Sequence, residues 1–193
     1  MKKICNILLV MIIIAIIIVV ALIAIKYTKN QINEQELSKV IETINKEITQ
    51  EEVTQEKQMY YKEYRVVGII KIPSIELEYP ILEITNNTTM RLSITKFWGN
   101  GVNEIGNLSL AGHNNYDGTM FGKTKQLETG DKIELTDMKG ITKNYIIYEK
   151  FITDPNNISV IETDEYGTRE VTLITCSNGN KERLILKARE EVI

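Results

Sequence analysis

The sequence predicts an all-β domain in residues 65–193, built as a barrel or a sandwich and preceded by helical segments. The first observation is a series of about eight short β-branched, apolar segments in this range, separated by Gly, Pro, Asn and Asp. The second is the scarcity of helical periodicity beyond Tyr64, which argues against a mixed α/β architecture. The third is an uncharged N-terminal run unlike the rest of the chain. We therefore expect three parts: 1–25, 26–64 and 65–193.

Residues 1–25 have the features of a transmembrane signal anchor. Lys2 and Lys3 precede the uncharged run Ile7–Ile25, which as a helix crosses a hydrocarbon core of about 30 Å. The run is longer than a typical signal-peptide core, although cleavage after the small residues of "ALIA" is an alternative. The two lysines favour a cytoplasmic N-terminus with everything after Ile25 outside the cell.

Residues 26–64 contain no Gly or Pro and are rich in Glu, Lys and Gln. Apolar residues recur there at helical spacing, three or four residues apart. They are Leu37, Val40, Ile41, Ile44 and Ile48. The pattern predicts a solvated helical or flexible stalk, and a dimerising coiled coil is the alternative.

The outer domain begins with "VVGIIKIPSIELEYPILE", which predicts two short strands with a proline-marked turn. Residues 86–101 are expected to form a short helix or a loop, and Asn107–Ala111 a strand. Residues 130–153 suggest a hairpin that turns at "DMKG". The segment 154–168 is a long loop of the kind that often has a function. "EVTLITC" and "KERLILKAR" are the last two strands, joined by the turn "SNGN".

Composition excludes several function classes. The net charge is −3 and no long basic block is present, which argues against nucleic acid as a partner. The single histidine and two cysteines do not make a ligand-spaced zinc cluster, and no phosphate-binding glycine pattern occurs. We expect neither a cofactor nor a metal.

Three residues of the outer domain suggest nucleophilic chemistry. Cys176 ends a predicted strand and has no disulfide partner within reach, because Cys5 lies at the membrane edge. The only histidine, His113, also ends a predicted strand and is the usual partner of a reactive thiol. Arg183 lies on the next strand, where a short hairpin would return it to the thiol as an oxyanion donor.

Each of these residues also has a simpler interpretation. A lone cysteine is often a small core residue, a lone histidine is often structural, and a strand arginine is often merely exposed. Arg189 has the same strand parity as Arg183 but lies about 20 Å further along at 3.3 Å per residue. Arg183 is therefore favoured.

Taken together, the segments "GIIKIPSIELEYPI", "LSLAGH", "VTLITC" and "RLILKA" resemble the sortases, the cysteine transpeptidases of Gram-positive cell surfaces. The resemblance extends from Val67 to Ala188 and implies an eight-stranded β-barrel. It implies that Cys176 attacks the Thr–Gly bond of an LPXTG-like sorting signal, with His113 as general acid/base and Arg183 holding the substrate and its oxyanion. An amine from a peptidoglycan precursor, or a pilin lysine, would resolve the thioester.

The resemblance also implies a set of substrate-binding residues. They are Leu173 and Thr175 on the cysteine strand, with Ile158, Val160 and Ile161 in the long loop. "GHNNYDGTMF" is similar to class B sortases, whereas "TLITC" and the compact domain are similar to classes A and D. The segment "FWGNGVNEIGN" offers only Glu104 as an acidic ligand, so no activating calcium is expected. The alternatives are a hydrolytic cysteine peptidase and a non-catalytic β-domain that binds surface peptides.

Overall fold

The computed structural model describes residues 2–50, 58–162 and 167–192. The chain divides into two compact units, Met1–Glu36 and Leu37–Ile193. Each unit is described by itself.

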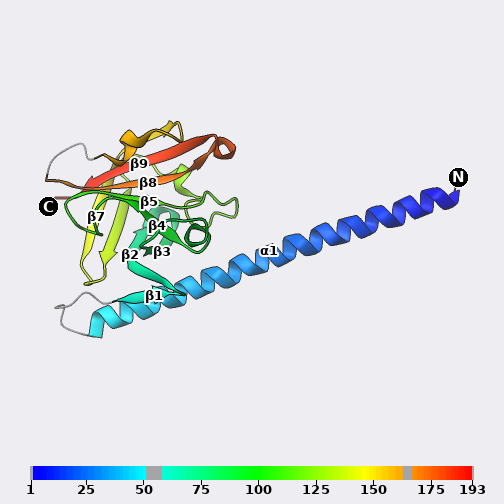
Figure 1. Cartoon of the computed structure of the whole chain (residues 1–193), viewed down its shortest axis with the longest axis horizontal. Coiled ribbons are helices and arrows are strands. Elements are labelled where there is room, and N and C mark those ends of the chain that lie inside the picture. The colour runs from blue at the N-terminus through cyan, green and yellow to red at the C-terminus, as the bar shows by residue number, and fades with distance from the viewer. Residues whose placement is uncertain (1, 51–57, 163–166, 193) are drawn as a thin grey trace. The chain divides into compact units, whose positions relative to one another are not determined.

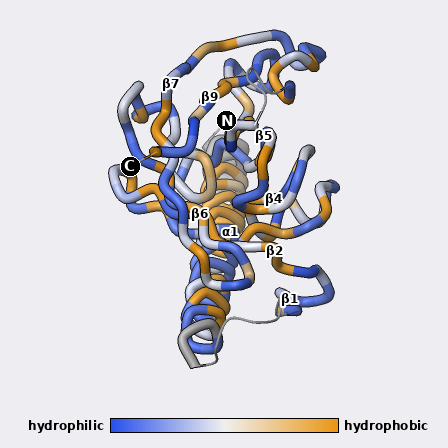
Figure 2. Tube along the Cα trace, turned by 90° about the vertical axis from the view of Figure 1, so that its left-hand side faces the viewer, coloured by the Kyte–Doolittle hydropathy of each residue, from blue (hydrophilic) through white to orange (hydrophobic). Residues whose placement is uncertain are grey.

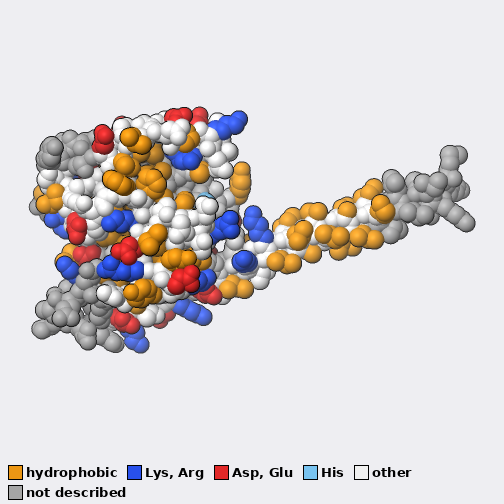
Figure 3. Space-filling view, viewed as in Figure 1, with side chains coloured by type: hydrophobic (Ala, Val, Ile, Leu, Met, Phe, Trp, Pro, Cys, Tyr) orange, Lys and Arg blue, Asp and Glu red, His pale blue; other side chains and the backbone are white. Residues whose placement is uncertain are grey.

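The first unit consists of the N-terminal part of helix α1 (Lys2–Gln50). Its apolar side chains are exposed to solvent, and Figure 3 shows them on the surface of the helix. Within the described residues, one helical stretch, in Met11–Glu47, is long and apolar enough to cross a membrane. The predicted anchor lies at the N-terminal end of this helix.

The C-terminal part of α1 belongs to the second unit and packs on its core. Leu37, Ile41 and Ile44 are buried, and they join one hydrophobic cluster with residues of the β-strands. This part of the predicted stalk is therefore covered by the domain and is not solvated on all sides. Ile48 and residues 51–57 lie outside the described side chains. The division at residues 25 and 64 remains a prediction.

A short strand at 59–61 precedes the predicted start of the β-domain at residue 65 and pairs with the next strand. The described strands are β1 Met59–Tyr61, β2 Tyr64–Ile72, β3 Leu77–Leu82, β4 Ile94–Trp98, β5 Gly106–Ala111, β6 Lys132–Asp137, β7 Thr142–Thr153, β8 Arg169–Ser177 and β9 Glu182–Glu190.

Strands β2 to β9 form a closed eight-stranded barrel, in agreement with the predicted fold (Figure 1). Their order is β2-β3-β4-β5-β8-β9-β7-β6, and a pairing of β6 with β2 closes the ring. Strand β1 adds to the edge of β2. The pairs β3–β4 and β5–β8 are parallel, and the other pairs are antiparallel. Closure removes the free edges that an open sheet would expose.

The local sequence accounts for most of the elements. Pro73 opens the short 3₁₀ turn Pro73–Ile75 between β2 and β3, and β6 and β7 form the predicted hairpin. Half-buried and buried residues alternate along the first four residues of β6, as the two-residue period of a strand requires. Figure 2 shows hydrophilic and hydrophobic residues interspersed along the chain of the β-domain. Tyr145 and Phe121 are the largest of the fully buried side chains that the structure describes.

One strand differs from the expectation. Residues 86–101 were expected to form a short helix or a loop, but they contain the 3₁₀ turn Thr89–Arg91 followed by β4. Strand β4 is short and is interrupted by a β-bulge between Lys96 and Trp98. The bulge breaks the two-residue alternation by which a strand is recognised in a sequence.

Candidate active site

Strands β5 and β8 run parallel and bring the ends that carry His113 and Cys176 together (Figure 1). Their register ends at Ala111 opposite Ile174, and the Gly112 N–H donates to the Ile174 carbonyl at 3.2 Å. Cys176 lies two residues beyond Ile174 on β8, and because side chains alternate between the faces of a strand, these two residues share a face. His113 follows the end of β5 by two residues.

The antiparallel hairpin of β8 and β9 places Arg183 beside the thiol. Cys176 and Arg183 are direct partners across the two strands, so their side chains leave the same face about 5 Å apart. The turn between them, Asn178–Asn180, has positive φ at all three residues: 45°, 60° and 73°. Asn and Gly tolerate this region best, which explains why "SNGN" makes the tight connection.

Two side-chain hydrogen bonds fasten the segment around His113 to β8. The Thr175 hydroxyl donates to the Gly112 carbonyl at 2.7 Å, and the Asn114 amide donates to the Cys176 carbonyl at 2.8 Å. His113 lies between these two anchor points and is half-buried. The structure thus holds the predicted histidine at the end of the strand that carries the cysteine.

A cavity of about 410 Å³ opens in front of the thiol and is lined mainly by apolar groups. Cys176 and Arg183 border it, together with Thr175 and Ile174. Gly112 borders it as well, immediately before His113. The surroundings suit an extended peptide with apolar side chains.

Arg183 and its competitor Arg189 have different surroundings. The Arg183 Nη1 donates to the Asn180 and Glu182 carbonyls at 3.1 and 3.0 Å. The Arg189 guanidinium donates to the Glu170 carboxylate at 2.9 Å and stacks on Tyr148 at 4.7 Å. Of the two arginines, only Arg183 borders the cavity.

The long loop after β7 supplies one wall of the cavity. Ile158, Val160 and Ile161 all border it, within the 3₁₀ segment Ile158–Ile161. The Asn157 side chain accepts from the Ser159 N–H at 3.1 Å and so caps this segment. Ile158 is 75% exposed, so most of its side chain is open to solvent at the edge of the cavity.

Leu173 does not lie where the sequence predicted. It is 1% exposed and belongs to the hydrophobic core, whereas its neighbour Ile174 borders the cavity. Ile174 and Cys176 share one face of β8, whereas Leu173 and Thr175 lie on the other. On that second face Leu173 is enclosed by the core, and only Thr175, nearer the end of the strand, reaches the cavity. Thr175 borders the cavity, but its buried hydroxyl is occupied by the Gly112 carbonyl.

Sequence reasoning missed the wall opposite the long loop. It comprises Thr85, Met90, Phe97 and Trp98. Phe97 and Trp98 are consecutive and both border the cavity, because the β-bulge in β4 suspends the usual alternation. The only signal for them in the sequence is that two aromatic residues are adjacent. In the structure both are exposed.

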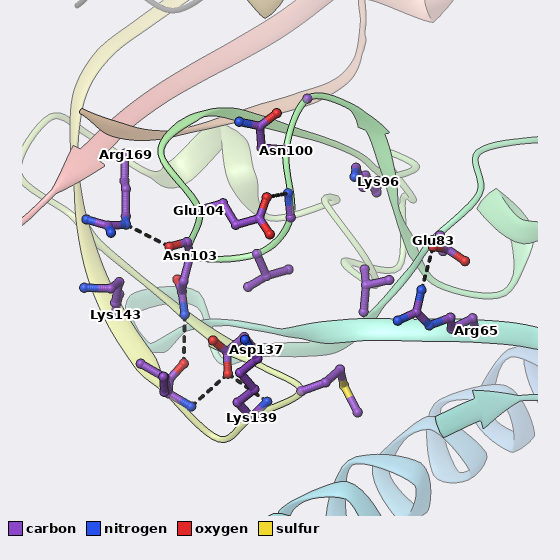
Figure 4. Close-up of a pocket in the computed structure, with 16 residues that line it drawn as sticks. Arg65, Glu83, Lys96, Asn100, Asn103, Glu104, Asp137, Lys139, Lys143 and Arg169 are labelled. Carbon is purple, nitrogen blue, oxygen red and sulfur yellow. Dashed lines mark hydrogen bonds and ion pairs between the residues drawn. The ribbon is translucent and has the colours of Figure 1, made fainter. Parts of the chain in front are cut away.

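A second cavity, of about 670 Å³, lies near the opposite ends of β5 and β8 and is lined mainly by polar groups (Figure 4). Asn103, at a φ of 64°, is central to it. The Arg169 Nε donates to the Asn103 carbonyl at 2.7 Å, and the Asn103 amide donates to the Ile141 carbonyl at 2.8 Å. The Tyr145 hydroxyl donates to Asn103 Oδ1 at 3.0 Å, and burial raises the pKa of Tyr145 well above its ordinary value.

Ionised groups complete this network. The Glu190 carboxylate pairs with Lys143 and with Arg169, and the hydrogen bond from Lys143 is the main reason that its pKa is lowered. Glu104 accepts from the Gly101 N–H at 2.8 Å. Among the side chains that the structure describes, no three His, Cys, Asp or Glu residues form a group that could hold a metal ion.

A closed barrel that brings a thiol, an imidazole and a guanidinium to neighbouring strand ends is typical of a cysteine-dependent acyl-transfer enzyme. The family model described as the Sortase domain matches residues 70–191. The chain therefore belongs to the sortase family.

Two curated relatives illustrate the similarity in sequence. Sortase A of Listeria monocytogenes is 34% identical over 117 residues, which cover 60% of this chain and 51% of that protein. Sortase D of Bacillus subtilis is 32% identical over 110 residues, which cover 56% of this chain and 53% of that protein. The chain thus spans about half the length of the curated relatives it matches.

Solved structures agree in fold. A Sortase D5 transpeptidase of Clostridium perfringens superposes with a TM-score of 0.65 at 25% identity, covering 84% of this chain and 99% of that chain. The crystal structure of Listeria monocytogenes sortase A gives a TM-score of 0.60 at 29% identity, covering 66% of this chain and 88% of that chain.

Proposed function

We propose that this chain is a membrane-anchored transpeptidase that cleaves an LPXTG-like sorting signal and transfers the cleaved protein to an amine. The observation that carries the proposal is the convergence of three strand ends. Cys176 and Arg183 are direct cross-strand partners beside the apolar cavity, and His113 is anchored to the cysteine strand from both sides.

In the first step, the Cys176 sulfur attacks the carbonyl carbon of the threonine before the scissile bond. The carbon–nitrogen bond breaks, and His113 gives a proton to the leaving amine. The products of this step are a thioester on Cys176 and a released peptide with a free N-terminus.

Arg183 stabilises the negative charge that develops on the carbonyl oxygen during this attack. A guanidinium is permanently charged and offers several donors, so it needs no proton transfer of its own. Its position directly across from Cys176 supports this role.

In the second step, an amine attacks the thioester carbon and loses a proton to His113, and the Cys176 thiolate leaves. The new amide bond joins the sorted protein to the acceptor. The acceptor is the amine of a peptidoglycan precursor or a pilin lysine, and the sorted proteins are surface proteins with a C-terminal sorting signal.

The apolar residues of the signal bind in the cavity. Ile158, Val160 and Ile161 form its loop wall, with Ile174 and Thr175 on β8. Leu173 contributes indirectly, as core packing behind the strand.

Residues 1–25 anchor the enzyme, with the N-terminus in the cytoplasm and the β-barrel outside the cell. The apolar part of α1, together with the two lysines ahead of it, supports this topology.

The experiment is mass spectrometry of the chain incubated with LPXTG, NPXTX and related peptides, with and without an added amine such as triglycine. We expect a peptide–amine product that grows with amine concentration. Product from water alone, unchanged by amine, would instead identify a hydrolytic peptidase. If the domain is folded but turns over no peptide, the remaining function is that of a non-catalytic domain that binds peptides.

A further inference from the structure

Asn114, the residue after His113, connects the loop that follows β5 to the strand of the nucleophile. Its side-chain Nδ2 donates to the carbonyl of Cys176 at 2.8 Å. This bond joins the neighbour of the proposed acid/base directly to the backbone of the proposed nucleophile.

The bond continues the hydrogen-bond pattern of the sheet beyond the point where the strand ends. In a parallel pair the bonds are evenly spaced, so the donor after Gly112 would be the backbone N–H of Asn114. The backbone of Asn114 instead turns away and forms an antiparallel bridge with Met120. The side-chain amide of Asn114 therefore donates the hydrogen bond to Cys176 that its backbone N–H would have donated.

The other side of the loop is fixed to the core. The Phe121 N–H donates to the His113 carbonyl at 3.0 Å, and Phe121 is fully buried. The Met120 N–H donates to the Tyr79 hydroxyl at 3.0 Å. His113 is thus held to the core through Phe121 and to β8 through Gly112 and Asn114, and of these contacts only that of Asn114 reaches Cys176 itself.

We propose that Asn114 is a positioning residue, whose bond to the Cys176 carbonyl keeps the His113 imidazole within reach of the Cys176 thiol. Its effect on turnover rests on the proposed function, whereas its effect on the pairing of thiol and imidazole does not. Small displacements of a catalytic group reduce rates strongly, so a single such bond has a measurable effect.

Asn115 is a matched control in the same loop. Its amide donates to the Thr119 hydroxyl at 2.9 Å, a bond that stays within the loop. Asn114→Ala and Asn115→Ala therefore make the same chemical change and each remove one side-chain hydrogen bond. Only the first removes the connection to β8.

The first test follows the alkylation of Cys176 by iodoacetamide as a function of pH, in the full chain. We expect the pH profile of Asn114→Ala to move toward that of His113→Ala, while Asn115→Ala matches the wild type. Identical profiles for Asn114→Ala and the wild type would overturn the proposal. Should Asn114→Ala not fold, Asn114→Ser provides the same comparison.

The second test is the single-turnover rate of acylation by a cleavable peptide. Asn114→Ala should lower this rate by about tenfold or more with little change in KM, and Asn114→Gln should recover part of it. A rate equal to that of Asn115→Ala would contradict the proposal. If the wild type acylates no peptide, the proposed function fails, but the alkylation profiles still decide the role of Asn114.

Discussion

The two ends of the β5–β8 strand pair differ in how their polar groups are satisfied. At the end where β5 and β8 begin, called the starting end, Arg169 donates to the Asn103 carbonyl and pairs with the Glu190 carboxylate. The charge of Arg169 is therefore balanced within the protein. At the finishing end, Cys176 and Arg183 border a cavity, and the Arg183 bonds given above go to backbone carbonyls of its own hairpin. Within the part of the chain that the structure describes, no carboxylate pairs with Arg183, so its guanidinium can bind an incoming anion. The difference indicates that polar contacts at one end stabilise the barrel, whereas the other end has the composition expected of the proposed active site.

The largest expected effect is a contrast between two substitutions on β9, one near each end of that strand. Arg183→Ala should lower kcat/KM for a sorting-signal peptide by about 10²–10³-fold, the usual cost of losing an oxyanion donor. Arg189→Ala should lower the Tm instead, because the nearly buried Glu170 loses its 2.9 Å partner. Peptide kinetics and thermal melts of both variants measure this contrast. An equal decrease in kcat/KM for the two variants would contradict the difference between the two ends.

The sequence predicts the positions of Cys176 and His113 because each follows a predicted strand, and that of Arg183 because a short hairpin returns it to Cys176. A short hairpin fixes which residues face each other, and a strand end fixes where a side chain meets a loop. The hairpin is a local rule, whereas the parallel pairing of β5 with β8 joins distant segments, so no local pattern predicts it.

The error at Leu173 has a physical cause. Strand β8 is buried on both faces along most of its length, so its pattern of apolar residues does not distinguish the cavity face from the core face. Only the pairing with β5 and β9 decides that Ile174 borders the cavity. Likewise, the apolar stripe of residues 37–44 was visible, but the surface on which it packs was not, since that contact is long-range.

The second prediction concerns stability at the starting end. Asn103→Ala removes the hydrogen bond to the Ile141 carbonyl and the acceptor of the Tyr145 hydroxyl, and it places Ala, which tolerates positive φ less well than Asn, at a φ of 64°. We expect a loss of about 2–4 kcal/mol in the free energy of unfolding. Asn100→Ala is the control, because this exposed residue of the same loop should cost less than about 1 kcal/mol. Urea unfolding of both variants provides the measurement, and similar losses would contradict the role given to Asn103.

The third prediction is a pH dependence of stability that arises at the starting end. The pKa of Glu190 is lowered in the folded state, chiefly by Lys143, so its ionised form contributes stability above the ordinary carboxyl value of 4.5. This contribution, of the order of 1 kcal/mol, is lost as the pH falls through the lowered pKa. Glu190→Gln should therefore destabilise the protein at pH 7 and flatten its acid-side decline in Tm. If the Tm of Glu190→Gln declines at acid pH as steeply as that of the wild type, the decline comes from other carboxyl groups.

The smallest effect concerns the loop wall of the cavity. Ile158→Ser should raise KM for an apolar sorting signal about fivefold without changing kcat, because one exposed apolar contact is lost. Ile152→Ser is the control, since Ile152 is also exposed but does not border the cavity. Equal KM values for both variants would remove Ile158 from the binding site.

The most direct test of the central claim is the intact mass of the protein after mixing with an LPXTG-like peptide in the absence of an amine. The wild-type chain should gain the mass of the acyl fragment and lose it on addition of hydroxylamine. Peptide mapping should place the adduct on Cys176. Cys176→Ala should gain no mass while keeping the wild-type Tm. An adduct that persists in Cys176→Ala, or a wild type that turns over peptide through no covalent intermediate, would contradict the assignment of Cys176 as the nucleophile.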